Sequence, residues 1–310
     1  MRIGIVGFGI IGSSWAIAAL RAHQDVVVCD PLLSATDMAT RIESVRRQVV
    51  RLDGEAGHGE GKGDIRNADT LASLAAAGCD YIQESIVEDL DAKRALFAEL
   101  DATAGEETIL ASSSSALPAS RIMGSLSERH RCIISHPATP PHLLPAVEVV
   151  PAPFTSAETV RRTQSILRAL GQKPVLLGKE VDGFAMNRLQ GVLLIEMLRL
   201  IREGVVSPAG ADTLIRDAFG MRWSILGPLE GVHLNAPGGI ADYFTRYQAM
   251  FDGIRQSPPA DPGVLGEEVL AALQAYCTAT VTLDAIGERK TWRDERFEEL
   301  AAWRAKAGLA

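Results

Sequence analysis

The first 180 residues alternate short apolar runs with longer amphipathic stretches. Apolar runs at 2–6 and 25–30 flank a glycine cluster and a helix-like stretch at 13–20. Strand, helix and strand within 30 residues predict a βαβ unit with parallel strands. Further strands are expected at 81–85, 108–111, 132–135, 146–150 and 174–177, and helices at 36–52, 91–103, 118–125 and 156–170. The pattern therefore predicts an α/β fold with a Rossmann-type, doubly wound, mostly parallel sheet.

The pattern changes after Gly183, where apolar residues recur at helical spacing. Helices are expected at 184–203, 208–218, 240–256, 264–287 and 293–306. A glycine-rich loop at 54–63 and a proline-rich breaker at 257–262 interrupt the elements. We predict two domains, a nucleotide-binding domain at 1–182 and a smaller all-helical domain at 183–310. The helical domain is expected to contribute to the substrate cleft and to dimerisation.

Composition narrows the functional classes. With a net charge of −8, the chain lacks the basic character that nucleic acids or anionic membranes attract. No apolar run is long enough to cross a bilayer, and the N-terminus has no signal-peptide pattern. The four cysteines are dispersed, so no metal site or redox motif is predicted, and a cytoplasmic location is expected. These features favour a small-molecule ligand.

A glycine motif follows the first predicted strand. Gly7, Gly9 and Gly12 form a GxGxxG pattern that also includes Ile10 and Ile11 and leads into the first predicted helix. In this context the motif predicts a dinucleotide site, with the pyrophosphate at the helix N-terminus. A glycine-rich turn in another doubly wound protein is the alternative.

Asp30 ends the second predicted strand, 18 residues after Gly12. A carboxylate at this position accepts hydrogen bonds from the adenosine ribose and repels a 2′-phosphate. The next residues, Pro31, Leu32 and Leu33, offer no cation for such a phosphate. The predicted cofactor is therefore NAD rather than NADP.

Three further strands or their ends carry polar residues that could act on a substrate. Ser115 follows one predicted strand and His136 another, so both are expected at the carboxyl edge of the sheet. Glu148 lies within an apolar run and needs a partner, for which a neighbouring imidazole is suitable. Histidine ordinarily titrates near neutral pH, so His136 could act as a general base oriented by Glu148, with Ser115 and Asn187 holding the reacting oxygen. A structural histidine and helix-capping serines are the alternatives.

These motifs together resemble the 3-hydroxyacyl-CoA dehydrogenase superfamily. The spacing from Ser115 to His136 and Glu148, and the segment 183–189 with Asn187, match the family's catalytic serine, histidine, glutamate and asparagine. The segment 84–93 resembles the part of the family that contacts NAD. The resemblance thus implies that Glu88, Lys93 and Ser115 contact the cofactor.

The resemblance is closest to the λ-crystallin branch, whose enzymes act as L-gulonate 3-dehydrogenases. It rests on segments 136–148, 205–208, 220–222, 227–236 and 292–295. Thr139 stands where the family usually has an asparagine near the nicotinamide, so Thr139 is the expected contact there. The segment 31–80 looks shorter than the helical hairpin that carries CoA in the acyl-CoA branch. A free hydroxy acid is therefore the expected substrate.

Three other functions are compatible with the sequence. L-carnitine dehydrogenase and 3-hydroxyacyl-CoA dehydrogenase are enzymatic alternatives, and a crystallin-like structural protein that binds nucleotide is the non-enzymatic one. For carnitine, Trp223 and Tyr243 are the candidate cage residues.

The substrate carboxylate requires a cation, for which Arg222 is the candidate and a salt-bridge role the alternative. The resemblance also implies a homodimer. The apolar segment 184–203 fits that expectation, although a helix buried within one chain would have the same pattern.

Overall fold

The computed structural model describes residues 1–53, 63–256 and 266–309. The predicted breaker at 257–262, and the predicted glycine loop except Gly63, lie outside these residues. The chain divides into two compact units, Met1–Arg188 and Leu189–Ala310. This division falls six residues after the predicted boundary at 182/183, because residues 184–187 contact the sheet unit.

The first unit contains an eight-stranded sheet, within the described residues, with the order β3-β2-β1-β4-β5-β6-β7-β8. The β6–β7 pair is antiparallel and the other pairs are parallel, which agrees with the predicted mostly parallel sheet. The strands are β1 (Arg2–Val6), β2 (Asp25–Cys29), β3 (Ile65–Asn67), β4 (Tyr81–Glu84), β5 (Ile109–Ser112), β6 (Cys132–Pro137), β7 (Ala146–Val150) and β8 (Lys173–Leu176).

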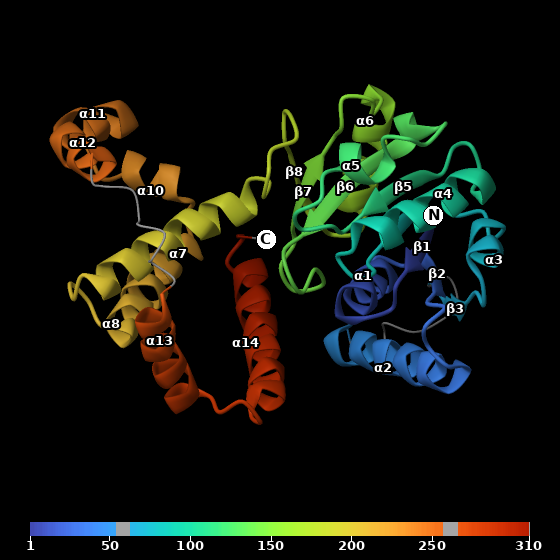
Figure 1. Cartoon of the computed structure of the whole chain (residues 1–310), viewed down its shortest axis with the longest axis horizontal. Helices are drawn as coiled ribbons and strands as arrows, with labels where there is room; N and C mark the ends of the chain where they lie inside the picture. The colour runs from blue at the N-terminus through green and yellow to red at the C-terminus, as the bar shows by residue number, and fades with distance from the viewer. Residues whose placement is uncertain (54–62, 257–265, 310) are drawn as a thin grey trace. The chain divides into compact units, whose positions relative to one another are not determined.

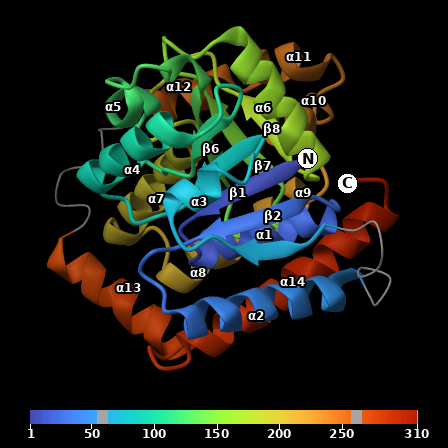
Figure 2. The same cartoon turned by 90° about the vertical axis from the view of Figure 1, so that its right-hand side faces the viewer.

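Helices cover both faces of this sheet (Figure 1). One apolar core includes residues of α1 (Ile10–Arg21), α2 (Ala35–Asp53) and α6 (Ala157–Ala169). The other includes residues of α3 (Leu71–Ala75), α4 (Leu90–Thr103) and α5 (Ala119–Met123). Consecutive strand residues alternate between the two cores, as Val26 and Val27 do. Figure 2 shows the strands between α1 and α2 on one side and α3 and α4 on the other. This is the doubly wound arrangement that the sequence predicts.

The strand β3 and the helix α3 of the first unit were not predicted. β3 is three residues long and only Ile65 is buried in it, so it has no apolar run to detect. The five-residue helix α3 begins at a capping box formed by Thr70 and Ser73. Both are too short for periodicity to reveal.

The second unit is helical, as predicted. After α7 (Met186–Arg202), which begins in the first unit, it contains α8 (Pro208–Thr213), a π-helical segment (Leu214–Gly220), α9 (Met221–Trp223), α10 (Pro228–His233), α11 (Gly239–Arg246), α12 (Gln248–Gln256), α13 (Glu267–Thr280) and α14 (Ile286–Lys306). The single helix predicted at 240–256 is therefore wrong, since Tyr247 leaves helical geometry between α11 and α12. The prediction of 264–287 is too long, because Val281 is extended and ends α13.

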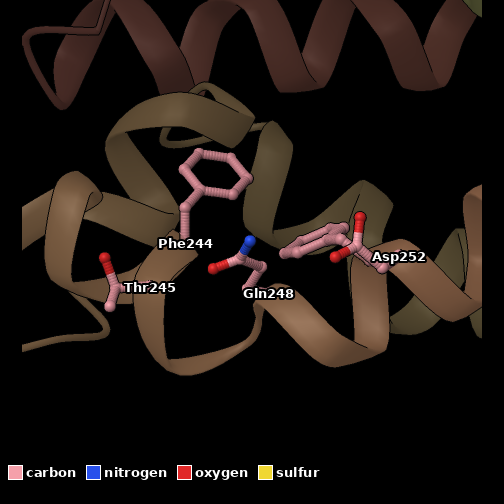
Figure 3. A pocket seen from close by; sticks show the side chains of 5 residues that line it. Phe244, Thr245, Gln248 and Asp252 are labelled. Atoms are coloured by element: carbon pink, nitrogen blue, oxygen red, sulfur yellow. The ribbon is translucent and has the colours of Figure 1, made fainter.

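A hollow of about 280 Å³ opens at the surface of the second unit (Figure 3). It is lined by Phe244 and Thr245 of α11 and by Gln248, Phe251 and Asp252 of α12. None of these five residues is a predicted site residue. No helix in the described part of the chain is long and apolar enough to span a membrane.

Candidate active site

The glycine motif forms the turn between β1 and α1. Gly7 has φ +84°, and a Cβ there would lie 2.7 Å from the carbonyl oxygen of Ser85. A Cβ at Gly12 would lie 1.9 Å from the Gly7 oxygen. Around Gly9, in contrast, a Cβ would meet nothing within 4 Å. Gly7 and Gly12 are thus required by packing, whereas Gly9 faces open space from which a ligand can approach the backbone.

The turn suits an anionic ligand. The N-cap of α1 is Gly9, which has no side chain to cap the helix, and the first turn contains no acidic residue. The exposed Ile10 and half-buried Ile11 lie in this turn, where helix N–H groups have no intrahelical acceptor. Free N–H groups and the helix dipole both favour a phosphate here. The residues therefore fit the pyrophosphate of a dinucleotide.

Asp30 lies beside this turn. Its Oδ2 accepts a hydrogen bond from Phe8 N at 2.8 Å, and its Oδ1 accepts one from Leu32 N at 3.1 Å. These bonds hold the carboxylate at the end of β2, next to the glycine turn. Each oxygen keeps a further lone pair, so the carboxylate can also accept from a ribose hydroxyl.

The order of the strands brings the glycine turn and the segment with Glu88 to the same edge of the sheet. β1 lies between β2 and β4, so β2 and β3 continue the sheet on one side of β1 and β4 continues it on the other. Ligands bind outside the carboxyl ends of the strands at such a switch point. The glycine turn follows β1 and the segment with Glu88 follows β4, and both therefore open at this edge.

His136 and Glu148 face each other on neighbouring strands. They are register partners in the antiparallel β6–β7 pair, and His136 Nδ1 lies 2.8 Å from Glu148 Oε2. Their exposed fractions are 5% and 4%. The expected imidazole partner for the buried carboxylate is thus present. If Nδ1 carries the proton, it donates to Glu148 and leaves Nε2 as the basic nitrogen.

The other oxygen of Glu148 anchors the start of α7. Oε1 accepts hydrogen bonds from Ala185 N and Met186 N, both at 2.8 Å. The buried ring of Phe184 lies 5.7 Å from the His136 ring, centre to centre. One carboxylate therefore orients the imidazole and also fixes the backbone that leads to Asn187.

Asn187 connects this turn to the predicted serine. Its Nδ2 donates to the carbonyl oxygen of Ser115 at 2.7 Å. Ser115 is exposed and Asn187 is half-buried, so both can meet a ligand. The structure thus links all four predicted catalytic residues through the path His136, Glu148, the 185–186 backbone, Asn187 and Ser115.

Glu88 holds the loop that carries Ser115. Its Oε1 accepts from Ser114 Oγ at 2.5 Å and from the backbone N–H groups of Ser115 and Ala116, each at 3.0 Å. Burial raises the pKa of Glu88, but these hydrogen bonds and the nearby charge of Lys93 outweigh it, so the pKa lies below its usual value. The carboxylate form is thus the one that fits this loop.

Lys93 is 1% exposed and lies between two carboxylates. Its Nζ is 2.7 Å from Glu84 Oε1 and 3.4 Å from Glu88 Oε2. Its expected contact with a cofactor stays a prediction; in this geometry its charge reaches the site through Glu88. Glu84 is a further member that sequence reasoning missed, although an acid at the end of a buried strand, nine residues before a lysine, was a usable signal.

Burial raises the pKa of Glu84, against the lowering effects of Lys93, Ser112 and the Ile86 N–H group. Ser112 Oγ donates to Glu84 Oε2 at 2.5 Å, and Lys93 donates to Oε1. The group therefore combines a buried ion pair with hydrogen bonds to its remaining lone pairs, as a stable buried pair requires.

Two predicted residues are not joined to this network by a described contact. Thr139 is exposed on the loop between β6 and β7. Arg222 belongs to the second unit, where its guanidinium lies over the Phe219 ring at 5.6 Å. Phe219 in turn stacks on Trp223, with ring centres 5.1 Å apart, so that tryptophan is already packed against another ring.

Comparison with known families identifies both units. Residues 2–181 match the NAD binding domain of 3-hydroxyacyl-CoA dehydrogenase, and residues 183–270 match the C-terminal domain of the same enzyme. The chain belongs to the 3-hydroxyacyl-CoA dehydrogenase family. Members of this family are NAD-dependent oxidoreductases that act on CH–OH groups, which agrees with the glycine turn and the polar sheet edge.

Individual proteins support this membership. The chain is 36% identical to rabbit (Oryctolagus cuniculus) lambda-crystallin over 96% of its own length and 94% of the relative's. It is also 36% identical to a 3-hydroxyacyl-CoA dehydrogenase of Gibberella moniliformis, over 82% and 78% of the two chains. The solved structure of the NAD+-dependent 5-formyl-3-hydroxy-2-methylpyridine 4-carboxylic acid 5-dehydrogenase aligns with a TM-score of 0.79 and 25% identity, over 98% and 97% of the two chains.

Proposed function

We propose that this family member is an NAD-dependent dehydrogenase that oxidises the 3-hydroxyl of a free hydroxy acid, in the manner of L-gulonate 3-dehydrogenase. The observation that carries the proposal is the buried His136–Glu148 pair, with Nδ1 and Oε2 2.8 Å apart at the carboxyl edge of β6. A neutral imidazole oriented by a carboxylate is a suitable general base for an alcohol.

The residues divide the work as follows. His136 Nε2 accepts the proton of the substrate hydroxyl, and the Glu148 carboxylate stabilises the imidazolium that forms. Ser115 and Asn187 hold the reacting oxygen, and the loop that carries Ser115 is fixed by the Asn187–Ser115 hydrogen bond and by Glu88. When bound at the glycine turn, NAD supplies the hydride acceptor.

Two observations support a free acid as substrate. The aligned structure with a TM-score of 0.79 is that of a dehydrogenase named for a free carboxylic acid rather than for a CoA thioester. Within the described residues, Arg222 forms no ion pair, so its guanidinium is available for a substrate carboxylate.

The test is turnover with NAD and a panel of hydroxy acids, followed by NADH absorbance. L-gulonate, L-carnitine and 3-hydroxybutyryl-CoA represent the three enzymatic possibilities. In the variant His136→Gln, turnover should fall by about 10²–10⁴-fold while NAD still binds. Binding of NAD without turnover of any substrate would favour a crystallin-like structural role, and unchanged turnover in His136→Gln would refute the general-base assignment.

We also propose a homodimer formed through the helical unit. Its described residues include many large apolar side chains that are exposed, such as Val192 on α7, Leu229 on α10, Ile254 on α12 and Trp303 on α14. Exposed apolar surface of this extent ordinarily marks an interface. Sedimentation equilibrium at micromolar concentration should give twice the chain mass, and a monomer alone would contradict the proposal.

A further inference from the structure

One cation beside the glycine turn has no role in the site described above. Arg41 lies on α2, next to Ile42 of the helix's buried face, and its own side chain is exposed. Its Nη1 donates to the carbonyl oxygen of Phe8 at 2.6 Å. Phe8 is the second residue of the GxGxxG motif, so the guanidinium of a distant helix reaches the phosphate-binding turn itself.

Arg41 and Asp30 contact the same residue from two directions. Asp30 Oδ2 accepts from Phe8 N at 2.8 Å, whereas Arg41 donates to Phe8 O. Both charged groups therefore lie at the turn on which a dinucleotide binds. Asp30 can serve the ribose hydroxyls, and a positive group at the same turn is suited to a phosphate.

The guanidinium of Arg41 keeps most of its donors. A guanidinium has five N–H donors, and the described contacts of Arg41 use one, with a backbone carbonyl. Within the described residues Arg41 pairs with no carboxylate, whereas Arg46 on the same helix pairs with Asp64 at 3.0 Å. Its charge is therefore not neutralised by an acid and can interact with an anion.

We propose that Arg41 is a further cofactor-binding residue, whose guanidinium donates to a phosphate of the bound adenine dinucleotide. This inference rests on the proposed NAD-dependent function. It adds a cation that the residues directly after Asp30 do not provide. Fixed by its bond to Phe8, Arg41 would bind the phosphate without a large loss of side-chain freedom.

The experiment measures dissociation constants for NAD, NADP, ADP and 2′,5′-ADP by calorimetry in the variants Arg41→Gln, Arg41→Lys and Arg47→Gln. Arg47 is the matched control, because it is an exposed arginine of the same helix with no described contact. Arg41→Gln should weaken nucleotide binding by about 10–100-fold, Arg41→Lys should weaken it less, and Arg47→Gln should resemble wild type. The melting temperatures of the apo proteins report any damage to the turn.

The nucleotides distinguish which phosphate is bound. Weaker binding of both NAD and ADP would place the guanidinium on the diphosphate, whereas a loss confined to NADP and 2′,5′-ADP would place it on the 2′-phosphate. Equal dissociation constants in Arg41→Gln and Arg47→Gln would overturn the inference. Wild type that binds NAD but oxidises no hydroxy acid would refute the proposed function and leave the Arg41 result intact.

Discussion

The substitution Glu148→Gln tests the site most directly, because it changes a single group and keeps the shape of the side chain. The backbone N–H groups of Ala185 and Met186 both donate to Oε1, each at 2.8 Å. Only the amide oxygen of a glutamine can accept these bonds, so its NH₂ group must face His136 Nδ1. Nδ1 then has to accept rather than donate, and the imidazole proton moves to Nε2.

That change of tautomer removes the base. A protonated Nε2 cannot take the proton of the substrate hydroxyl, so we expect turnover to fall by about 10²–10⁴-fold. The two backbone bonds persist but lose their charge assistance, which costs about 0.5–1.5 kcal/mol each. The free energy of unfolding should therefore drop by about 1–3 kcal/mol, which leaves a well-behaved domain folded.

The assay is NADH formation at saturating hydroxy acid, with NAD affinity measured separately by calorimetry. NAD affinity should stay near wild type, because the glycine turn and Asp30 lie at the ends of other strands. Glu107→Gln serves as the control, since the side chain of Glu107 is 93% exposed and pairs only with Arg162 among its described contacts. Wild-type turnover in Glu148→Gln would refute the tautomer argument and the role assigned to the pair.

Three further changes test other parts of the site. Asp30→Ala should raise the dissociation constant for NAD and narrow its difference from NADP, as measured by calorimetry; a wild type that already prefers NADP would contradict the assignment. Arg222→Met should raise KM for the hydroxy acid by about 10–100-fold with NAD affinity intact, and equal KM values would eliminate Arg222. Glu88 has a lowered pKa in the folded protein, so its carboxylate stabilises the fold above its unfolded pKa, and that contribution is lost as pH falls through the folded value. Denaturant titrations should therefore show that Glu88→Gln is less stable than wild type at neutral pH and that this stability difference shrinks below about pH 4. A stability difference that stays constant with pH would contradict the assignment.

The sequence predicted much of the first unit because its signals are local. The GxGxxG motif between two apolar runs identified the cofactor turn, and an apolar run containing Glu148 required a partner that the structure supplies as His136. The pairing of β6 with β7 is antiparallel, which no local pattern predicts, yet this pairing places the two side chains opposite each other.

Other features depend on contacts between distant residues. The charged group of Glu84, Lys93 and Glu88 depends on where β4 ends relative to α4, and sequence reasoning assigned two of its members to the cofactor directly. In the helical unit, apolar periodicity runs through Tyr247, so the hydrophobic pattern does not reveal the break between α11 and α12. Periodicity identifies a face to be covered, but it does not identify where the backbone turns.

The contacts of Glu148 and Asn187 hold the proposed base and the residues proposed to bind the reacting oxygen in fixed relative positions. Glu148 fixes His136 through Oε2 and the 185–186 backbone through Oε1, and Asn187, the next residue, donates to the Ser115 carbonyl oxygen. Ser115 is held independently by Glu88, whose carboxylate is balanced by Lys93. The buried carboxylate of Glu148 thus positions His136 and the start of α7, and the exposed carboxylate of Glu88 positions the Ser115 backbone. Because such bonds are short and directional, removing either carboxylate should displace the reacting groups, and a small displacement is enough to lower a rate that depends on alignment.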